Sequence, residues 1–388
     1  MDINLTPVDV AECITALIAR NKLWAGKKVY AYFIANKAAG CFTNSHKSEK
    51  YKAIFDKTLA EIKTLPECAV SVNYKIFSTE YPGHAKDLTY SVVSQLIATD
   101  EKDTESLIVT AGGDGTSLEV QTALYKCAME GPKHSDAIMN KIAILRLPLG
   151  TGNDGTDGHK IEDTIEMLKG GLVFANSRAV RVYPEKEVSA EEVEASAKAC
   201  GKKMTKYCDP EFKAPWYSFN IASLGLDAYV VYMTNTVKKK LPGNFYHLCV
   251  PLSGLIYDKD FPCGDATIEL FENEEKKGEY KTKITLMAMG ASGNRVYGGG
   301  HKVLPNENNF CIAPKVTLTK LVFNNNKFVD GSFVGTDLAY LHTVDKVRLS
   351  YDKPILMQCD GETVMLTPAQ FPLIMELTPP CLRVLQQI

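Results

Sequence analysis

The sequence lacks any apolar run near the length of about 20 residues that a membrane-spanning helix needs. It also has little net charge, because 44 Lys and Arg side chains nearly balance 46 Asp and Glu side chains. We therefore expect no broad basic surface and no nucleic-acid partner. Residues 1–10 have neither a basic start nor an apolar segment, so we expect no export signal.

Paired cysteines are also missing. The 11 cysteines are scattered, with no CxxC pair and no cluster at metal-ligand spacing. An odd number of cysteines without an export signal fits a reducing cytosol better than a disulfide framework. We therefore expect a cytoplasmic location. The oligomeric state stays open, and a homodimer is compatible with the sequence.

The clearest motif present is a glycine-rich turn after an apolar run. Residues 107–116 read LIVTAGGDGT, and apolar residues at helical spacing follow as far as residue 128. This pattern predicts a buried parallel strand, a tight turn and then a helix. Glycines let a ligand approach the backbone, and free N–H groups at a helix N-terminus favour a phosphate. The expected phosphate-binding residues of this turn are Gly112, Gly113, Gly115 and Thr116. Asp114 lies between them but is not expected to bind phosphate directly, because its charge would repel it.

A second glycine-rich turn follows the next predicted strand, residues 142–147. Residues 147–154 read LPLGTGND, so this turn again comes directly after apolar residues. Its expected binding residues are Gly150, Thr151, Gly152, Asn153 and Asp154. The alternative is that Asp114 and Asp154 only brace the two turns, as Asp often does.

Strands and helices alternate through the first half of the chain. We expect strands over 29–34 and 69–77, and helices over 48–65, from residue 85, and over 161–168. Short connections between them predict a parallel, doubly wound α/β domain over residues 1–175, with ligands at the carboxyl ends of its strands. Asn36 and both glycine turns fall at such ends.

The two turns in this order resemble the diacylglycerol kinase catalytic-domain family, which includes soluble bacterial diacylglycerol kinases and sphingosine kinases. The resemblance implies an α/β domain like those of NAD kinases and lipid kinases, followed by a β-sandwich domain. It also implies ATP and Mg²⁺ as cofactors and a lipid substrate at a membrane surface, hence peripheral membrane association. The family usually has Asn-Pro at the nucleotide. This chain keeps Asn36 but has Lys37 in place of the proline.

The expected β-sandwich domain spans residues 176–365, with a charged insertion over 184–215 and a hairpin turning at 273–278. A tail, residues 366–388, is expected to return to the first domain. The family's lipid pocket corresponds to an apolar stretch, residues 241–257, which follows three lysines, 238–240. These lysines are expected to be either a solvated turn or a membrane contact.

The resemblance assigns acidic residues to the chemistry. Asp360 matches the family's general base in Asp-Gly-Glu, and Glu362 would support the metal or its network. Asp114 would hold water on the catalytic Mg²⁺ or orient the attacking hydroxyl, and Asp227 would accept a hydrogen bond from the substrate's hydroxyl. The alternatives are a hairpin turn at Asp360 and a turn-capping role for Asp227.

One metal site of the family is altered in this chain. Asn308 and Asn309 stand where soluble bacterial members have Asp-Gly after a Gly-Gly-Gly segment, here residues 298–300. Because Asn carries no charge and Mg²⁺ prefers carboxylate oxygen, we do not expect the family's structural Mg²⁺ here.

The sequence therefore predicts an ATP-dependent lipid kinase that phosphorylates a primary hydroxyl, with diacylglycerol or a sphingoid base as acceptor. Two alternatives stay open. An NAD kinase shares GGDGT but does not explain LGTGND, and a non-catalytic member would bind nucleotide or lipid without phosphoryl transfer.

Overall fold

The computed structural model describes residues 4–99, 103–150, 152–201, 213–238, 256–297 and 300–388, together with Met204, Tyr207 and Ser253. The chain divides into two compact units. Unit 1 contains residues 1–177 and 380–388, and unit 2 contains residues 178–379. None of the helices in the described part of the chain is long and apolar enough to cross a membrane.

Unit 1 is built on one sheet with the strand order β2-β1-β3-β4-β19-β5. All neighbouring strands run parallel except β5, which is antiparallel to β19. This confirms the predicted doubly wound α/β fold. The strands are β1 (Lys28–Ala35), β2 (Ser71–Ser78), β3 (Thr104–Gly112), β4 (Ile142–Pro148), β5 (Leu172–Ser177) and β19 (Leu382–Gln387).

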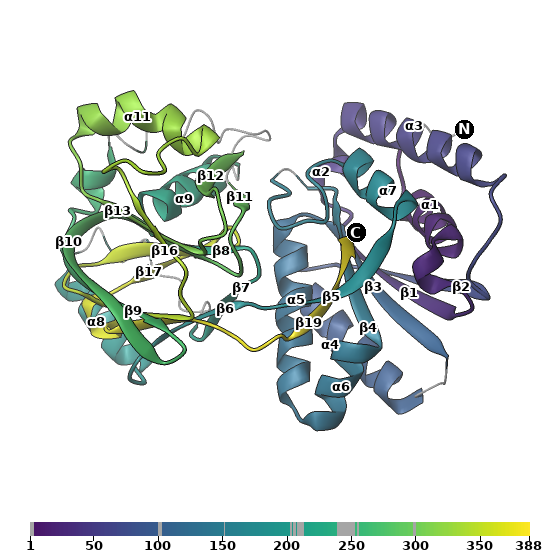
Figure 1. Ribbon diagram of the computed structural model, residues 1–388, viewed down its shortest axis with the longest axis horizontal. Coiled ribbons are helices and arrows are strands. Elements are labelled where there is room, and N and C mark those ends of the chain that lie inside the picture. The colour runs from purple at the N-terminus through teal and green to yellow at the C-terminus, as the bar shows by residue number, and fades with distance from the viewer. Residues whose placement is uncertain are drawn as a thin grey trace. The chain divides into compact units, whose positions relative to one another are not determined.

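Helices cover both faces of this sheet (Figure 1). One face carries α1 (Pro7–Arg20), α3 (Ser45–Ile62) and α7 (Ile161–Lys169), and the other carries α4 (His84–Thr99), α5 (Asp114–Met129) and α6 (Pro132–Asn140). A short helix, α2 (Gly40–Thr43), follows β1, and a 3-10 turn over Lys22–Trp24 follows α1.

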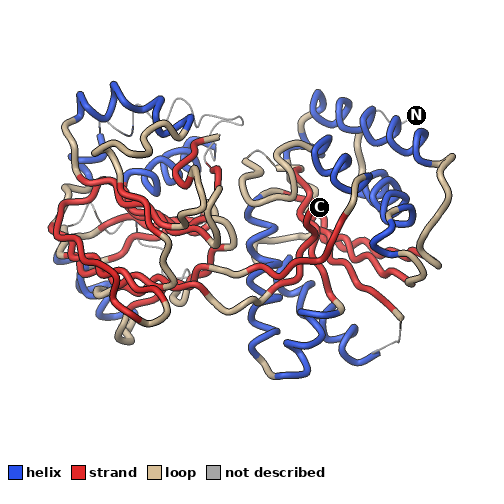
Figure 2. Tube along the Cα trace, viewed as in Figure 1, coloured by secondary structure: helices blue, strands red, loops and turns tan. Residues whose placement is uncertain are grey.

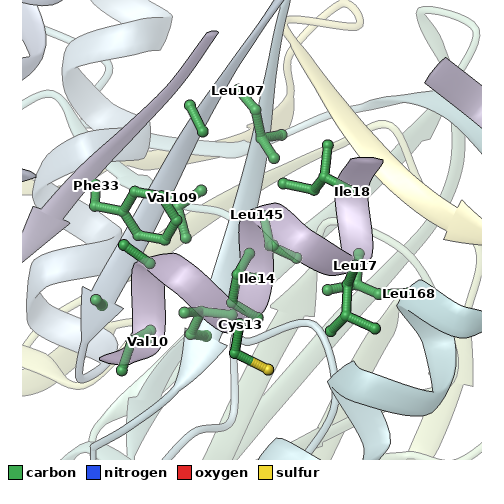
Figure 3. Packing of buried hydrophobic residues seen from close by; sticks show 14 of the residues in the cluster. Val10, Cys13, Ile14, Leu17, Ile18, Phe33, Leu107, Val109, Leu145 and Leu168 are labelled. Carbon is green, nitrogen blue, oxygen red and sulfur yellow. The ribbon is translucent and has the colours of Figure 1, made fainter. Parts of the chain in front are cut away.

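Helix α1 shows how the sequence determines local structure in this unit. Thr6 caps the helix by accepting the N–H of Asp9, whose carboxylate accepts the N–H of Thr6. The buried residues Ile14, Leu17 and Ile18 recur at helical spacing. They pack with residues of β1, β3 and β4, including Phe33, Leu107 and Leu145 (Figure 3).

Unit 2 is rich in strands (Figure 2), and they pair antiparallel. Its long strand β10 (Glu275–Gly290) pairs with β9 along its first half and with β8 and β13 along its second half, so it joins two layers. Buried apolar residues from both layers form one core, as expected for the predicted sandwich. The other strands are β6 (Val180–Pro184), β7 (Trp216–Ser218), β8 (Ile221–Gly225), β9 (Asp265–Glu272), β11 (Arg295–Tyr297), β12 (His301–Leu304), β13 (Phe310–Pro314), β14 (Tyr340–His342), β15 (Lys346–Tyr351), β16 (Ile355–Cys359), β17 (Glu362–Leu366) and β18 (Leu373–Leu377).

In the described residues of unit 2, the helices with given bounds are α8 (Ala190–Ala199), α9 (Leu226–Lys238) and α11 (Leu318–Asp330), with a 3-10 turn over Pro368–Gln370. Helix α8 lies in the expected insertion. The tail is divided between the units, because β18 pairs with β6 and β15 in unit 2, whereas β19 lies in the sheet of unit 1. Lysines 239 and 240, residues 241–252, and residues 298–299 of the Gly-Gly-Gly segment lie outside the described residues.

Candidate functional site

The residues predicted to bind phosphate gather at the carboxyl ends of β1, β3 and β4. Strand β1 has β2 on one side and β3 on the other, so the strand order reverses there, as at ligand-binding edges of doubly wound sheets. The Asn36 N–H donates to Ala111 O at 3.0 Å, and the Cys41 N–H donates to Leu149 O at 3.3 Å. These bonds connect the loop after β1 with the end of β3 and with the loop after β4.

Asn36 links its own loop to the first glycine turn. Its Oδ1 accepts the N–H of Ala38 at 2.9 Å, and its Nδ2 lies 3.4 Å from Thr116 Oγ1. Thr116 is buried and packs beneath Gly112, where an added Cβ would lie 2.7 Å from Thr116 Oγ1. Asn36, Gly112 and Thr116 are therefore brought together as predicted from their positions at strand ends.

The two glycine turns touch through their backbones. A Cβ added to Gly150 would lie 2.5 Å from the Cα of Gly113, and one added to Gly152 would lie 2.5 Å from Asp114 Oδ2. Real Cβ atoms do not approach backbone atoms so closely, so glycine is required at position 150, whereas a side chain at position 152 would displace the Asp114 carboxylate. Gly113 is the N-cap of α5 and has no side chain to cap the helix, which leaves its end open to an anion.

Asp114 braces the second turn. Its carboxylate accepts the N–H of Asn153 at 2.8 Å and the N–H of Gly155 at 3.4 Å. Asn153 adopts φ 64° and closes its own turn, since its side chain accepts the Gly150 N–H at 2.9 Å and donates to Pro148 O at 3.2 Å. Asp114 therefore braces the second glycine turn through its carboxylate.

Asp154 follows the second turn, and its Oδ2 lies 3.9 Å from the point that a Cβ on Gly152 would occupy. Thr151, predicted to donate to phosphate, lies outside the described residues. Within the described part of the chain, no three His, Cys, Asp or Glu side chains cluster closely enough to hold a metal ion.

An ion pair behind the glycine turns was not foreseen from the sequence. Arg146 in β4 contacts Asp157 through Nη2 at 2.5 Å and Nε at 3.2 Å, and its N–H donates to Asp157 Oδ2 at 2.7 Å. Both side chains are largely buried, and Arg146 also reaches Gln121 of α5 at 3.2 Å. An arginine inside the apolar run 142–147 is the sequence signal for such a pair, because a buried charge needs a partner.

Glu119 of α5 joins the loop after β2 to this region. Its carboxylate accepts the N–H of Gly83 at 2.9 Å and the N–H of Ala85 at 3.2 Å, at the start of α4. Tyr81 in the same loop is 53% exposed and stacks on the His84 ring, with centroids 4.4 Å apart. Loops from β1, β2, β3 and β4 are therefore held together at this edge.

Asp360 occupies a hairpin turn of unit 2, between β16 and β17. Asp360 and Gly361 have φ 47° and 95°, the left-handed conformations of a two-residue hairpin. The Asp360 carboxylate accepts the Ser218 hydroxyl at 2.5 Å and three backbone N–H groups, from Phe219 at 2.6 Å and from Asn220 and Ile221 at 3.1 Å each.

These contacts have opposing effects on the charge of Asp360. Burial raises the pKa of Asp360 above its ordinary value of 3.8, while the hydrogen bonds to Ser218, Phe219, Ile221 and Asn220 act in the opposite direction. Glu362 is exposed at the start of β17. Asp360 is therefore both the anchor of the β7–β8 turn and a carboxylate of raised basicity.

Asp227 lies near this hairpin at the start of α9 and is only 5% exposed. The Ser223 hydroxyl donates to Asp227, and Gln358 Nε2 donates to Ser223 Oγ at 2.9 Å. Gln358 Oε1 accepts the N–H of Gly361 at 2.9 Å. A chain of hydrogen bonds therefore links Asp227 with the turn that carries Asp360, and Gln358 is a member that sequence reasoning missed.

Asn308 and Asn309 use their amides in local hydrogen bonds. Asn309 exchanges two bonds with the backbone of Val344, at 3.0 and 2.9 Å. Asn308 Nδ2 donates to Asn306 Oδ1 at 3.0 Å, and its Oδ1 accepts the Thr343 hydroxyl at 3.2 Å. Their contacts are those of a structural loop.

Comparison with known proteins finds a family match over the part of the chain that holds both glycine turns. Residues 31–183 match the family model of the diacylglycerol kinase catalytic domain, a stretch that includes both glycine turns. No curated protein sequence matches the chain.

Solved structures resemble most of the chain in fold. A diacylglycerol kinase from Bacillus anthracis str. Sterne is 12% identical, with 92% of this chain and 96% of that chain covered and a TM-score of 0.50. Two putative diacylglycerol kinases from the same organism are 15% and 13% identical with the same coverage, at TM-scores of 0.53 and 0.54. At these identities the similarity shows a shared fold.

Proposed function

We propose that this chain, whose residues 31–183 match the diacylglycerol kinase catalytic domain, transfers the γ-phosphoryl group of ATP to the primary hydroxyl of a lipid. The observation that carries the proposal is the contact between the two glycine turns at the N-terminus of α5. Such an edge offers backbone N–H groups and the positive end of a helix dipole to a triphosphate. Diacylglycerol or a sphingoid base is the proposed acceptor, met at a membrane surface.

In this proposal, Gly112, Gly113 and Gly115 hold the phosphates through backbone N–H groups, and Gly150 and Gly152 let the second turn approach. Asn153 keeps the second turn closed, and Thr151 and Thr116 contribute hydroxyls. Mg²⁺ bound with ATP would neutralise charge on the β- and γ-phosphates, with Asp114 and Asp154 as the carboxylates available to its water. Asn36 fixes the neighbouring loop.

Unit 2 would supply the acid–base chemistry. Asp360 would accept the proton of the lipid hydroxyl, a task that its raised pKa suits, because a more basic carboxylate accepts a proton more readily. Asp227, held by Ser223, would orient the acceptor hydroxyl. Glu362 would support the water and metal network from the exposed end of the same hairpin.

The test is phosphoryl transfer from γ-labelled ATP with Mg²⁺ to a panel of diacylglycerol, sphingosine, ceramide and NAD. Label in a lipid supports the proposal and names the acceptor class. Label in NAD alone would show an NAD kinase, and nucleotide binding without label in any acceptor would show a non-catalytic protein. Either of the last two outcomes rejects the lipid kinase proposal.

A further inference from the structure

The two glycine turns carry negative charge where a polyphosphate is proposed to bind. Over residues 112–116 and 149–157 the charged residues are Asp114, Asp154 and Asp157. The nearest cation in β4, Arg146, is already committed to Asp157 through several short contacts. Backbone dipoles and Mg²⁺ offset part of the repulsion, but a polyphosphate site with this composition calls for a further cation.

Lys37 is placed to be that cation. It lies between Asn36 and Ala38 in the turn that follows β1, and it is exposed. In the described part of the chain, its side chain has no hydrogen bond or ion pair with another residue. An ammonium group on a flexible four-carbon stem can therefore move to a ligand without breaking an existing contact.

The backbone on either side of Lys37 is fixed to both glycine turns. Asn36 bonds to Ala111 O and reaches Thr116 at the first turn. Ala39 donates to Asn36 O at 2.9 Å, and Cys41 donates to Leu149 O at 3.3 Å beside the second turn. Hydrogen bonds thus hold the backbone on both sides of Lys37 and leave its side chain free to move to a ligand, so binding need not order the loop as well.

We infer that Lys37 binds the β- and γ-phosphates of the nucleotide and supplies positive charge that a proline at this position could not. The inference rests on the proposed function, since it assigns a ligand to the same edge of unit 1. Lysine acts as a point charge toward phosphate, so the contact requires charge more than a particular geometry. Lys37 is a binding residue in this scheme and takes no part in proton transfer.

Binding of a series of adenine nucleotides with one, two or three phosphates tests the inference with the full-length protein. Affinities for AMP, ADP and ATP are measured with Mg²⁺ by calorimetry in the wild type, Lys37→Met and Lys37→Arg. Lys37→Met should bind ATP and ADP about tenfold more weakly, the size expected for one charged hydrogen bond, while its affinity for AMP stays unchanged. Lys37→Arg should retain most of the wild-type affinity.

The matched control is Lys57→Met, because the Lys57 side chain is 79% exposed on α3 and forms its ion pair with Glu61 of the same helix. This variant should bind all three nucleotides as the wild type does. Unchanged ATP affinity in Lys37→Met would overturn the inference, and so would an equal loss for AMP, which would indicate damage to the loop. A wild-type protein that binds none of the nucleotides would reject the proposed function itself.

Discussion

Gly150 is the residue on which the approach of the two glycine turns depends. In Gly150→Ala, the new methyl group would lie 2.5 Å from the Cα of Gly113, so the backbones must separate. We expect destabilisation by about 2 kcal/mol, as for overpacking of a close contact, and at least a tenfold loss of ATP affinity. Thermal unfolding and calorimetric ATP titration measure the two effects.

Gly278→Ala is the control for this substitution, because the nearest atom to its added Cβ is a Leu270 methyl group at 3.9 Å. That variant should unfold within about 0.5 kcal/mol of the wild type. If Gly150→Ala matched it in both stability and ATP affinity, the two turns would not need to touch.

Asp360 gives a prediction about pH. Burial raises the pKa of Asp360, so in the proposed kinase mechanism protonation of this carboxylate should abolish phosphoryl transfer at a pH above 3.8. The effect of Asp360 on folding stability has the opposite sign. Because the folded protein binds the proton more tightly than the unfolded chain does, the contribution of Asp360 to the free energy of unfolding is complete below the unfolded pKa. It is lost as the pH rises through the folded pKa.

The measurement is the pH dependence of kcat, with folding monitored by circular dichroism across the same range. Its acid limb should lie above pH 3.8 while the protein remains folded. An acid limb at or below that pH, in folded protein, would remove Asp360 as the proton acceptor. The Asp360 contribution to stability is lost as the pH rises, whereas its contribution to activity is lost as the pH falls. The effect on folding can therefore be separated from the effect on activity.

The sequence predicted the strand, turn and helix order of the two glycine turns, but not the contacts that their residues make with distant parts of the chain. The glycine turns could be recognised because strand, glycine and helix signals are local. The bonds from Asp114 to Asn153 and from Gln358 to Ser223 could not, because they join residues 39 and 135 positions apart. Such bonds depend on how the strands are ordered, which local periodicity does not determine.

Strand β19 makes the C-terminal tail essential to unit 1. It is inserted between β4 and β5, and Arg383 bonds to Glu105 of β3 at 2.7 Å and to Asn140 O at 2.6 Å. The Arg383 guanidinium also lies 3.5 Å from the Phe174 ring centroid. A chain ending at residue 379 would therefore leave the edges of β4 and β5 open.

We expect Arg383→Ala to destabilise unit 1 by about 3 kcal/mol, because Glu105 would keep a largely buried charge without this partner. Urea unfolding measures the change, and Arg181→Ala, whose ion pair with Glu376 in unit 2 is more exposed, is the comparison and should cost less. Equal effects of the two substitutions would contradict a special role for β19.

Elements with strong local patterns were predicted closely, and elements defined by distant pairing were not. The helix expected over 48–65 is α3 at Ser45–Ile62, and the strand expected over 142–147 is β4 at Ile142–Pro148. The turn expected over 273–278 is shorter, because β10 begins at Glu275. There the exposed charged residues of β10 pair with β9, and pairing with a partner strand outweighs the loop-like composition.

At the scale of the whole molecule, the chain leaves unit 1 after residue 177 and returns to it at residue 380. The two connecting segments are tied to each other. Thr378 donates its N–H to Ala179 O at 2.9 Å and accepts the Ala179 N–H through its hydroxyl at 3.0 Å, and Cys381 donates to Ser177 O at 2.9 Å. Unit 2 is thus a continuous insertion whose two ends meet.

This arrangement predicts that unit 2 folds alone and unit 1 does not fold without its tail. A fragment of residues 178–379 keeps both layers and their shared core, so it should unfold cooperatively in urea. A fragment of residues 1–177 lacks β19 and should be largely unfolded, whereas the same fragment joined by a short flexible linker to residues 380–388 should fold and bind ATP. Circular dichroism shows which of the three fragments fold, and ATP calorimetry shows which of them bind ATP. If residues 1–177 alone folded and bound ATP as tightly as the joined fragment, β19 would be dispensable and the unit would be defined by its first five strands.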